Sequence, residues 1–160
     1  MTNKNKYILI SLLSLGLIGI DILTKILFEG KNYVLIKNFL TFESTHNYGA
    51  GLGILSGQTV LLIVLTFVFL GFFVFYDVYS KNKNKLYIIA FCFILSGAIG
   101  NLIDRIIFGY VRDFIHINIS IMPYYFNFAD IFLTVGVILF IIEILFKREH
   151  KKDDKELESK

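Results

Sequence analysis

Two aspartates, Asp113 and Asp130, are the residues whose types and positions best suit catalysis. Asp113 follows one strongly apolar segment and Asp130 begins the next, so a loop that folds back could bring their carboxyls together. Two carboxyls a few ångströms apart do not both ionise readily and share one proton. The ionised one could then activate a water for attack on a carbonyl, while the protonated one polarises that carbonyl and later protonates a leaving amine. The pattern leaves Asp21 and Asp104 open as replacements for either partner.

Other catalytic chemistries find little support in the sequence. A serine nucleophile needs a base beside it, yet there is no Gly-x-Ser-x-Gly motif and no histidine in an apolar segment. His46 and His116 lack the spacing of a metal-binding motif such as His-Glu-x-x-His. Cys92 is the single cysteine, which excludes an internal disulfide and a multi-cysteine zinc site. We therefore expect no metal, no cofactor and no nucleic-acid partner.

The elements that must position these aspartates are membrane-spanning helices. Of the 160 residues, 56% are hydrophobic and 18% are charged, whereas a typical soluble domain is about 25% charged. A helix that crosses the hydrocarbon core of a bilayer needs about 20 mostly apolar residues. Four segments approach this length: residues 7–28, 59–76, 86–108 and 128–146. The sequence therefore predicts an all-α integral membrane protein, a single membrane domain with four transmembrane helices.

The distribution of lysine and arginine predicts the orientation of these helices. Basic residues accumulate in cytoplasmic segments, and here they concentrate at the N-terminus, in the loop 77–85 and in the tail 147–160. Both termini should then be cytoplasmic, with residues 29–58 and 109–127 outside. Segment 29–58 is rich in β-branched and aromatic residues and predicts a short strand pair. The charged tail is expected to be solvated and disordered.

Polar side chains gather near the outer ends of the predicted helices. Ionisable groups within membrane spans are costly, which makes them candidates for function. Each also has a simpler structural explanation. Asp21 and Lys25 could form an ion pair one helical turn apart, and Asp104 with its neighbour Arg105 could anchor a helix end at the headgroups. At the opposite membrane face, Glu143 is one turn from a lysine and is expected to snorkel to the interface.

Five short motifs follow one another along the chain. They are Asp-Ile-Leu-Thr-Lys at 21–25, Asn-Tyr-Gly-Ala-Gly-Leu-Gly at 47–53, Ser-Gly-Ala-Ile-Gly-Asn-Leu-Ile-Asp-Arg at 96–105, Gly-Tyr-Val-Arg-Asp-Phe at 109–114 and Phe-Asn-Phe-Ala-Asp at 126–130. In type and order they resemble the motifs of the bacterial lipoprotein signal peptidases, or signal peptidase II. The sequence departs from the family pattern at Ile22, Ser96, Leu52 and Ile131, none of which removes a carboxyl.

The resemblance implies both an activity and a site. Family members are aspartic endopeptidases of the bacterial cytoplasmic membrane, which cut the signal peptide of diacylglyceryl-modified prolipoproteins just before the lipidated cysteine. The catalytic pair would be Asp113 and Asp130. The residues expected to line or support the site are Asn47, Gly49, Asn101, Asp104, Arg105, Asn127, Ala129, Asp21 and Lys25.

The resemblance also implies an architecture and partners. The predicted strand pair becomes a small extracytoplasmic β-cradle that clasps the substrate, and a short helical element is expected in the second external loop. The active site would lie at the extracytoplasmic face. The chain would act as a monomer, with the prolipoprotein and membrane lipid as its partners.

Two other functions fit parts of the pattern. In a small four-helix transporter, Asp21 or Asp130 would bind a proton or a cation, although transporters usually place such residues near the middle of the membrane. In a non-catalytic scaffold, the polar cluster would only hold the helices together. The clustering of polar groups near one membrane face favours the peptidase.

Overall fold

The computed structural model describes residues 3–51, 54–80, 84–119 and 122–158. The end of the glycine-containing motif, residues 52–53, lies outside these ranges, and so does the departure at Leu52. Eight elements follow in chain order: α1 (Asn3–Phe28), β1 (Asn32–Ile36), β2 (Leu40–Asn47), α2 (Thr59–Tyr79), α3 (Lys85–Phe108), β3 (Val111–Ile119), β4 (Met122–Phe126) and α4 (Phe128–Glu158). All four helices contain a segment long and apolar enough to cross a membrane, which agrees with the four predicted spans.

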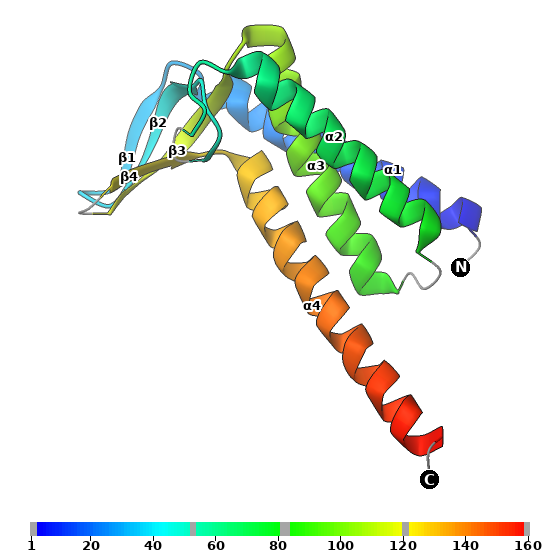
Figure 1. Cartoon of the computed structure of the whole chain (residues 1–160). Coiled ribbons are helices and arrows are strands. Elements are labelled where there is room, and N and C mark those ends of the chain that lie inside the picture. The colour runs from blue at the N-terminus through cyan, green and yellow to red at the C-terminus, as the bar shows by residue number, and fades with distance from the viewer. Residues whose placement is uncertain (1–2, 52–53, 81–83, 120–121, 159–160) are drawn as a thin grey trace.

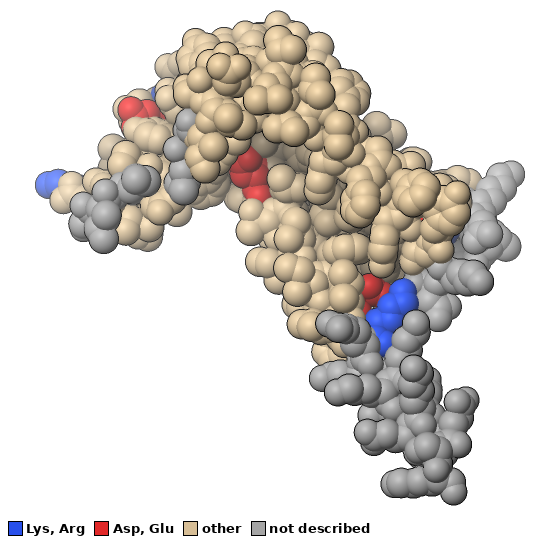
Figure 2. All heavy atoms as spheres, viewed as in Figure 1, with Lys and Arg blue, Asp and Glu red and all other residues tan. Residues whose placement is uncertain are grey.

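The helices form a bundle with the sheet at one end, and both chain termini lie at the opposite end (Figure 1). Helix α3 is the centre of this bundle, because 67% of its apolar span is buried, compared with 11–22% in the other three helices. The outer surfaces of α1, α2 and α4 are covered with exposed leucine, isoleucine, valine and phenylalanine side chains. Most of the helix surface visible in Figure 2 carries no charge. Such a surface is compatible with lipid and not with water.

Helices α3 and α4 pack with their backbones almost in contact. A Cβ atom added at Gly97 would lie 2.6 Å from the backbone nitrogen of Leu133 and closer still to the carbonyl oxygen of Ala129. On the other helix, a Cβ at Gly136 would lie 2.7 Å from the backbone nitrogen of Ile94. Small residues allow this close approach of helices in lipid. The packing fixes the first turn of α4, including Asp130, against α3.

We expect Gly97→Ala to destabilise the protein, because the added methyl group must push the α4 backbone away. Overpacking of this kind costs about 1–3 kcal/mol of unfolding free energy. The measurement is the midpoint of thermal unfolding in detergent. Gly71→Ala in α2 is the matched control, because nothing lies within 4 Å of a Cβ added there. Equal midpoints for the two variants would contradict the close packing.

The sheet is antiparallel, with strand order β1-β2-β3-β4, so one half comes from the segment between α1 and α2 and the other from the segment between α3 and α4. Strand β2 pairs with β3 in a register that places Thr45 opposite Asp113. The strand pair expected in residues 29–58 is confirmed, but the helical element expected in residues 109–127 is wrong, because that segment forms the β3–β4 hairpin. Alternating β-branched residues favour a strand here, and the hairpin covers the edge of β2 that would otherwise be unpaired.

Aromatic packing attaches the sheet to the bundle. Phe28, at the end of α1, stacks on Phe114 of β3 with ring centroids 5.0 Å apart, and it contacts Phe42 of β2 at 4.5 Å. Because successive side chains of a strand point to opposite faces, the neighbouring residue Asp113 points away from this aromatic contact. The contact therefore sets the direction in which the Asp113 carboxyl points.

The end of the bundle away from the sheet holds a second polar cluster, which the sequence did not predict. Helix α2 extends to Tyr79, so Asp77 is helical and buried and does not belong to a loop. Its carboxyl accepts hydrogen bonds from the hydroxyls of Tyr7 and Tyr87 and lies 3.6 Å from the Lys6 ammonium. These contacts join α1, α2 and α3.

The C-terminal part of the chain also differs from expectation. Helix α4 continues to Glu158, although residues 147–160 were expected to be disordered. Lysine and glutamate are good helix formers, so a charged composition does not itself end a helix. Glu143 lies 3.6 Å from Lys147, but its carboxyl is buried, whereas a snorkelling side chain would be exposed.

Candidate active site

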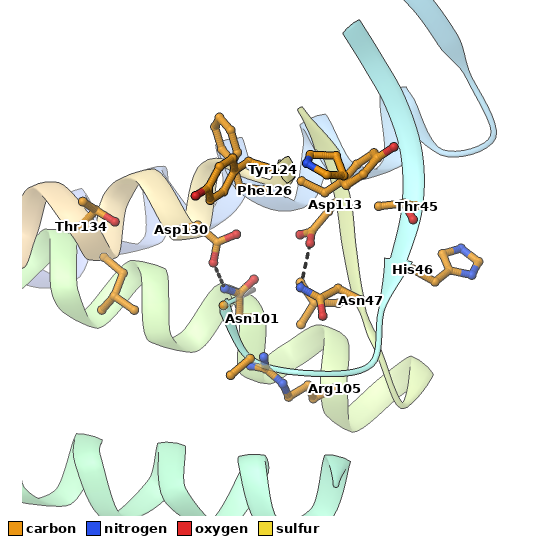
Figure 3. A pocket seen from close by; sticks show the side chains of 16 residues that line it. Thr45, His46, Asn47, Asn101, Arg105, Asp113, Tyr124, Phe126, Asp130 and Thr134 are labelled. Atoms are coloured by element: carbon orange, nitrogen blue, oxygen red, sulfur yellow. Dashed lines mark hydrogen bonds between the residues drawn. The ribbon is translucent and has the colours of Figure 1, made fainter. Parts of the chain in front are cut away.

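Asp113 and Asp130 meet at the sheet-bearing end of the bundle, on the wall of one cavity of about 530 Å³. Asp113 comes from β3 and Asp130 from the first turn of α4, and both carboxyls point into the same space (Figure 3). Figure 2 shows acidic side chains at the floor of a hollow between the sheet and the upper end of α4. The two residues predicted as a catalytic pair are thus brought together from two elements that are separated along the chain by β4.

Asn127 joins the two carboxyls and also begins α4. Its side-chain oxygen accepts a hydrogen bond from the backbone N–H of Asp130 at 3.0 Å, and its own backbone N–H donates to the Asp130 carboxyl at 3.2 Å. This reciprocal pair is a capping box, formed here with aspartate at the third helical position. The Asn127 amide nitrogen donates to Asp113 Oδ1 at 2.7 Å. One residue therefore starts the helix and aligns both acids.

Two further asparagines complete the hydrogen bonding of the pair. Asn101 donates to Asp130 Oδ1 at 2.7 Å, and Asn47 donates to Asp113 Oδ2 at 2.9 Å (Figure 3). Each of the four carboxyl oxygens of the pair thus accepts a hydrogen bond from an N–H group. Such donors orient the carboxyls and limit their motion. Asn47 is itself oriented by the backbone N–H of Gly49, which donates to its side-chain oxygen at 2.9 Å.

Behind these asparagines lies a buried group of charges. Lys25 lies 2.7 Å from Asp21 and 3.3 Å from Asp104, and all three side chains are fully buried. The Lys25 ammonium also donates to the Asn101 side-chain oxygen at 3.1 Å, so the charge cluster touches the residue that holds Asp130. Asp21 forms the ion pair expected of it and is also an acceptor for the backbone N–H of Ala129 at 2.8 Å.

Asp104 has a partner that sequence reasoning missed. Arg112 on β3 donates to it from its guanidinium at 2.7 Å and from its backbone N–H at 3.0 Å. Asp104 is fully buried, so the simpler explanation of an anchor at the headgroups is wrong. Its neighbour Arg105 instead lines the cavity and donates to the carbonyl oxygen of Gly49 at 3.0 Å. This bond holds the loop that follows β2 against the cavity.

All the residues expected at the site therefore lie in one connected region. The cavity also has lining residues that no motif indicated, among them Tyr124 and Phe126 from β4 and Thr134 from α4. The two aromatic residues could have been found only by recognising β4, because that strand forms one wall of the cavity.

Burial and the neighbouring charge raise the pKa of Asp113 to about 7 from its usual value near 4, with burial the larger cause. The Asp130 carboxyl is the charge that adds to this effect, and the hydrogen bonds from Asn47 and Asn127 oppose it. A carboxyl with such a pKa retains its proton at a pH where an ordinary aspartate is ionised. The geometry and this pKa suit a pair of acids that share one proton.

The carboxyl oxygens of the pair accept hydrogen bonds from N–H groups. In a cation site, such oxygens would instead face the ion. Within the described ranges, no group of three or more histidine, cysteine, aspartate or glutamate side chains is arranged to hold a metal ion.

The fold and the site together define a class: membrane enzymes whose four helices carry paired aspartates at one end, beneath a small antiparallel sheet. Comparison with known proteins identifies the family within this class. The profile of the family described as Signal peptidase (SPase) II matches residues 13–146. The chain therefore belongs to the lipoprotein signal peptidase (signal peptidase II) family, and it is an aspartic peptidase.

Individual relatives agree with this assignment. The chain is 41% identical over 123 residues to a lipoprotein signal peptidase of Clostridium novyi, covering 76% of this chain and 83% of the relative. It is 37% identical over 147 residues to that of Staphylococcus carnosus, covering 91% and 92%. A bacterial membrane enzyme solved by the in meso method at 2.3 Å is 34% identical, with a TM-score of 0.79 and coverage of 89% and 90%. The chain is thus a bacterial multi-pass membrane protein. Its assignment as a lipoprotein signal peptidase takes the place of the transporter and scaffold interpretations of the sequence.

Proposed function

We propose that Asp113 and Asp130 are the catalytic pair of this signal peptidase, and that it cuts diacylglyceryl-modified prolipoproteins just before the lipidated cysteine. Prolipoproteins are the substrates of the family. The observation that carries the proposal is the shared hydrogen bonding of the two acids around one open cavity. Asn127 bonds to both of them, and every carboxyl oxygen has an N–H donor.

The proposed mechanism uses one proton on two carboxyls. The ionised carboxyl takes a proton from a water molecule, whose oxygen attacks the carbonyl carbon of the scissile peptide bond. The protonated carboxyl donates to the carbonyl oxygen as negative charge develops there. Transfer of a proton to the nitrogen of the collapsing intermediate then releases the amine of the lipidated cysteine. Asn47, Asn101 and Asn127 keep both acids oriented throughout.

The position of the site suits a substrate that stays attached to the bilayer. The cavity lies where α3 and α4 meet the sheet, and polar residues share its lining with apolar ones such as Val111 and Leu133. We propose that this end is the extracytoplasmic face of the cytoplasmic membrane and that both termini are cytoplasmic. Lysine and arginine are concentrated in the tail 147–160 and in the segment 77–85 of the sequence, which supports this orientation. Both acids come from one chain, which supports action as a monomer.

A cleavage assay with two matched substrates tests the proposed specificity. The purified full-length protein is incubated with a prolipoprotein that carries the diacylglyceryl group and with the same protein lacking it. We expect a cut only in the lipidated substrate, and mass spectrometry should place it immediately before the modified cysteine. Equal cleavage of both substrates, or a cut elsewhere, would contradict the proposal.

The rate of cleavage should decline as the pH rises through about 7, the pKa of Asp113. Below this pH the pair keeps the proton that polarises the scissile carbonyl. Above it the proton dissociates and both carboxyls carry charge, so the general acid is lost. The measurement is kcat/KM across the neutral range at constant ionic strength, with protein stability recorded at each pH. A rate that keeps rising above neutrality in a folded protein would refute this use of the pair.

A further inference from the structure

The cavity continues past the two acids along α4. Leu133 and Thr134 line it on the helix side, and Ala50 and Gly51 line it from the loop after β2. Thr134 is one helical turn beyond Asp130 on α4 (Figure 3), roughly 6 Å further along the helix axis at the usual rise per residue. This part of the cavity therefore lies deeper in the apolar span of α4, which runs from Phe128 to Lys147.

Thr134 is the polar side chain in this deeper part. The hydrogen bonding of its hydroxyl differs from that of other helical threonines in the protein. Threonine in a helix usually bonds to the carbonyl oxygen one turn earlier. Thr24 in α1 and Thr66 in α2 do so, each at 2.8 Å. Over the residues that the structure describes, the Thr134 hydroxyl makes no hydrogen bond, although it is exposed to the cavity.

A peptide that binds in the cavity for cleavage needs a hydrogen-bonding group such as the Thr134 hydroxyl. The chain near the scissile bond must be extended, because a helix would shield the carbonyl carbon from the attacking water. An extended peptide at membrane depth has main-chain groups with no partner, and each unpaired group costs several kcal/mol. The signal peptide is the apolar part of the substrate, so its last residues lie on the deeper side of the two acids.

We propose that the Thr134 hydroxyl donates a hydrogen bond to a main-chain carbonyl of the signal peptide, on the side of the cut that remains within the membrane. The inference rests on the proposed function of Asp113 and Asp130 and adds a substrate-binding residue to it. The bond exists both before and during the reaction, so it contributes to substrate binding and not to the chemical step.

Steady-state kinetics with three variants test this role. Thr134→Val removes the hydroxyl and keeps the shape of the side chain. We expect its KM for a lipidated prolipoprotein to rise roughly three- to tenfold, as for a neutral hydrogen bond, with kcat unchanged. Thr134→Ser keeps the hydroxyl and should keep the KM of the unaltered protein. Thr66→Val is the matched control, because that hydroxyl bonds to its own helix outside the cavity.

The ester carbonyls of the diacylglyceryl group are the other acceptors within reach, so the assay is repeated with a substrate whose lipid chains are ether-linked. The rise in KM for Thr134→Val should persist with this substrate. Its disappearance would assign the bond to the lipid and overturn the proposal. An unchanged KM in Thr134→Val would also overturn it. Neither result affects the catalytic assignment, which is tested separately by the activities of Asp113→Asn and Asp130→Asn.

Discussion

Asp113→Asn and Asp130→Asn are each expected to lower kcat by roughly 10³- to 10⁴-fold, because asparagine keeps the size of aspartate but exchanges no proton. The two acids act as a unit, so either change alone should remove nearly all of the acid–base contribution. Both variants should still fold, since the asparagine oxygen can keep one of the two hydrogen bonds that each carboxyl accepts, the bond from Asn47 at position 113 and the bond from Asn127 at position 130. The measurement is the rate of prolipoprotein cleavage per mole of folded protein.

A third aspartate provides the control for this experiment. Asp77 is buried like Asp113, but it lies at the opposite end of the bundle and touches no part of the cavity. Asp77→Asn should therefore keep the activity per folded molecule, even if it lowers stability. An Asp113→Asn or Asp130→Asn protein with more than about a tenth of the normal rate would contradict the assignment, since loss of acid–base catalysis costs at least about 100-fold.

Asp104→Ala should produce the largest loss of stability. The Asp104 carboxyl lies within 3.3 Å of the Lys25 ammonium and 2.7 Å of the Arg112 guanidinium. Its removal leaves the buried Arg112 guanidinium without its carboxylate partner and Lys25 with Asp21 alone. Breaking a buried ion pair from one side costs about 3–5 kcal/mol of unfolding free energy. The measurements are the midpoint of thermal unfolding in detergent and the amount of protein recovered from membranes.

An exposed contact between two polar side chains supplies the comparison. Glu29 lies 3.0 Å from His46, and both side chains are about 40% exposed. Exposed pairs contribute about 0–1 kcal/mol, so Glu29→Ala should unfold close to the temperature of the unaltered protein. If Asp104→Ala behaves like Glu29→Ala, the buried charges do not hold α1, α3 and β3 together in the way described.

The meeting of Asp113 and Asp130 at one cavity could be predicted because its signals are local in the sequence. Asp130 belongs to a helix start that Asn127 and the apolar run after it make recognisable. Asp113 occurs in a short motif with a glycine and an aromatic residue at fixed distances. The i,i+4 spacing of Asp21 and Lys25 likewise predicts the contact that the structure contains.

The features that were missed depend on contacts between distant segments. Arg112 is one of several basic residues near a predicted span, and only the return of β3 toward α3 makes it the partner of Asp104. The β3–β4 hairpin is favoured by pairing with β2, which is separated from it by two helices. In the sequence, Asp77 looks like part of a polar loop. The Tyr87 hydroxyl that donates a hydrogen bond to it comes from the next helix, so the sequence around Asp77 does not reveal this partner. Local propensity does not include these partners.

The double role of Asn127 has a consequence for inhibition. Its side chain caps α4 and holds the carboxyl of Asp113, so replacing it would loosen the helix start and misalign the acid in one step. A compound whose affinity came mainly from hydrogen bonds to the Asn127 amide would therefore bind a residue that few substitutions could replace without loss of function. Resistance would have to arise at positions of the cavity wall that have no part in capping or alignment.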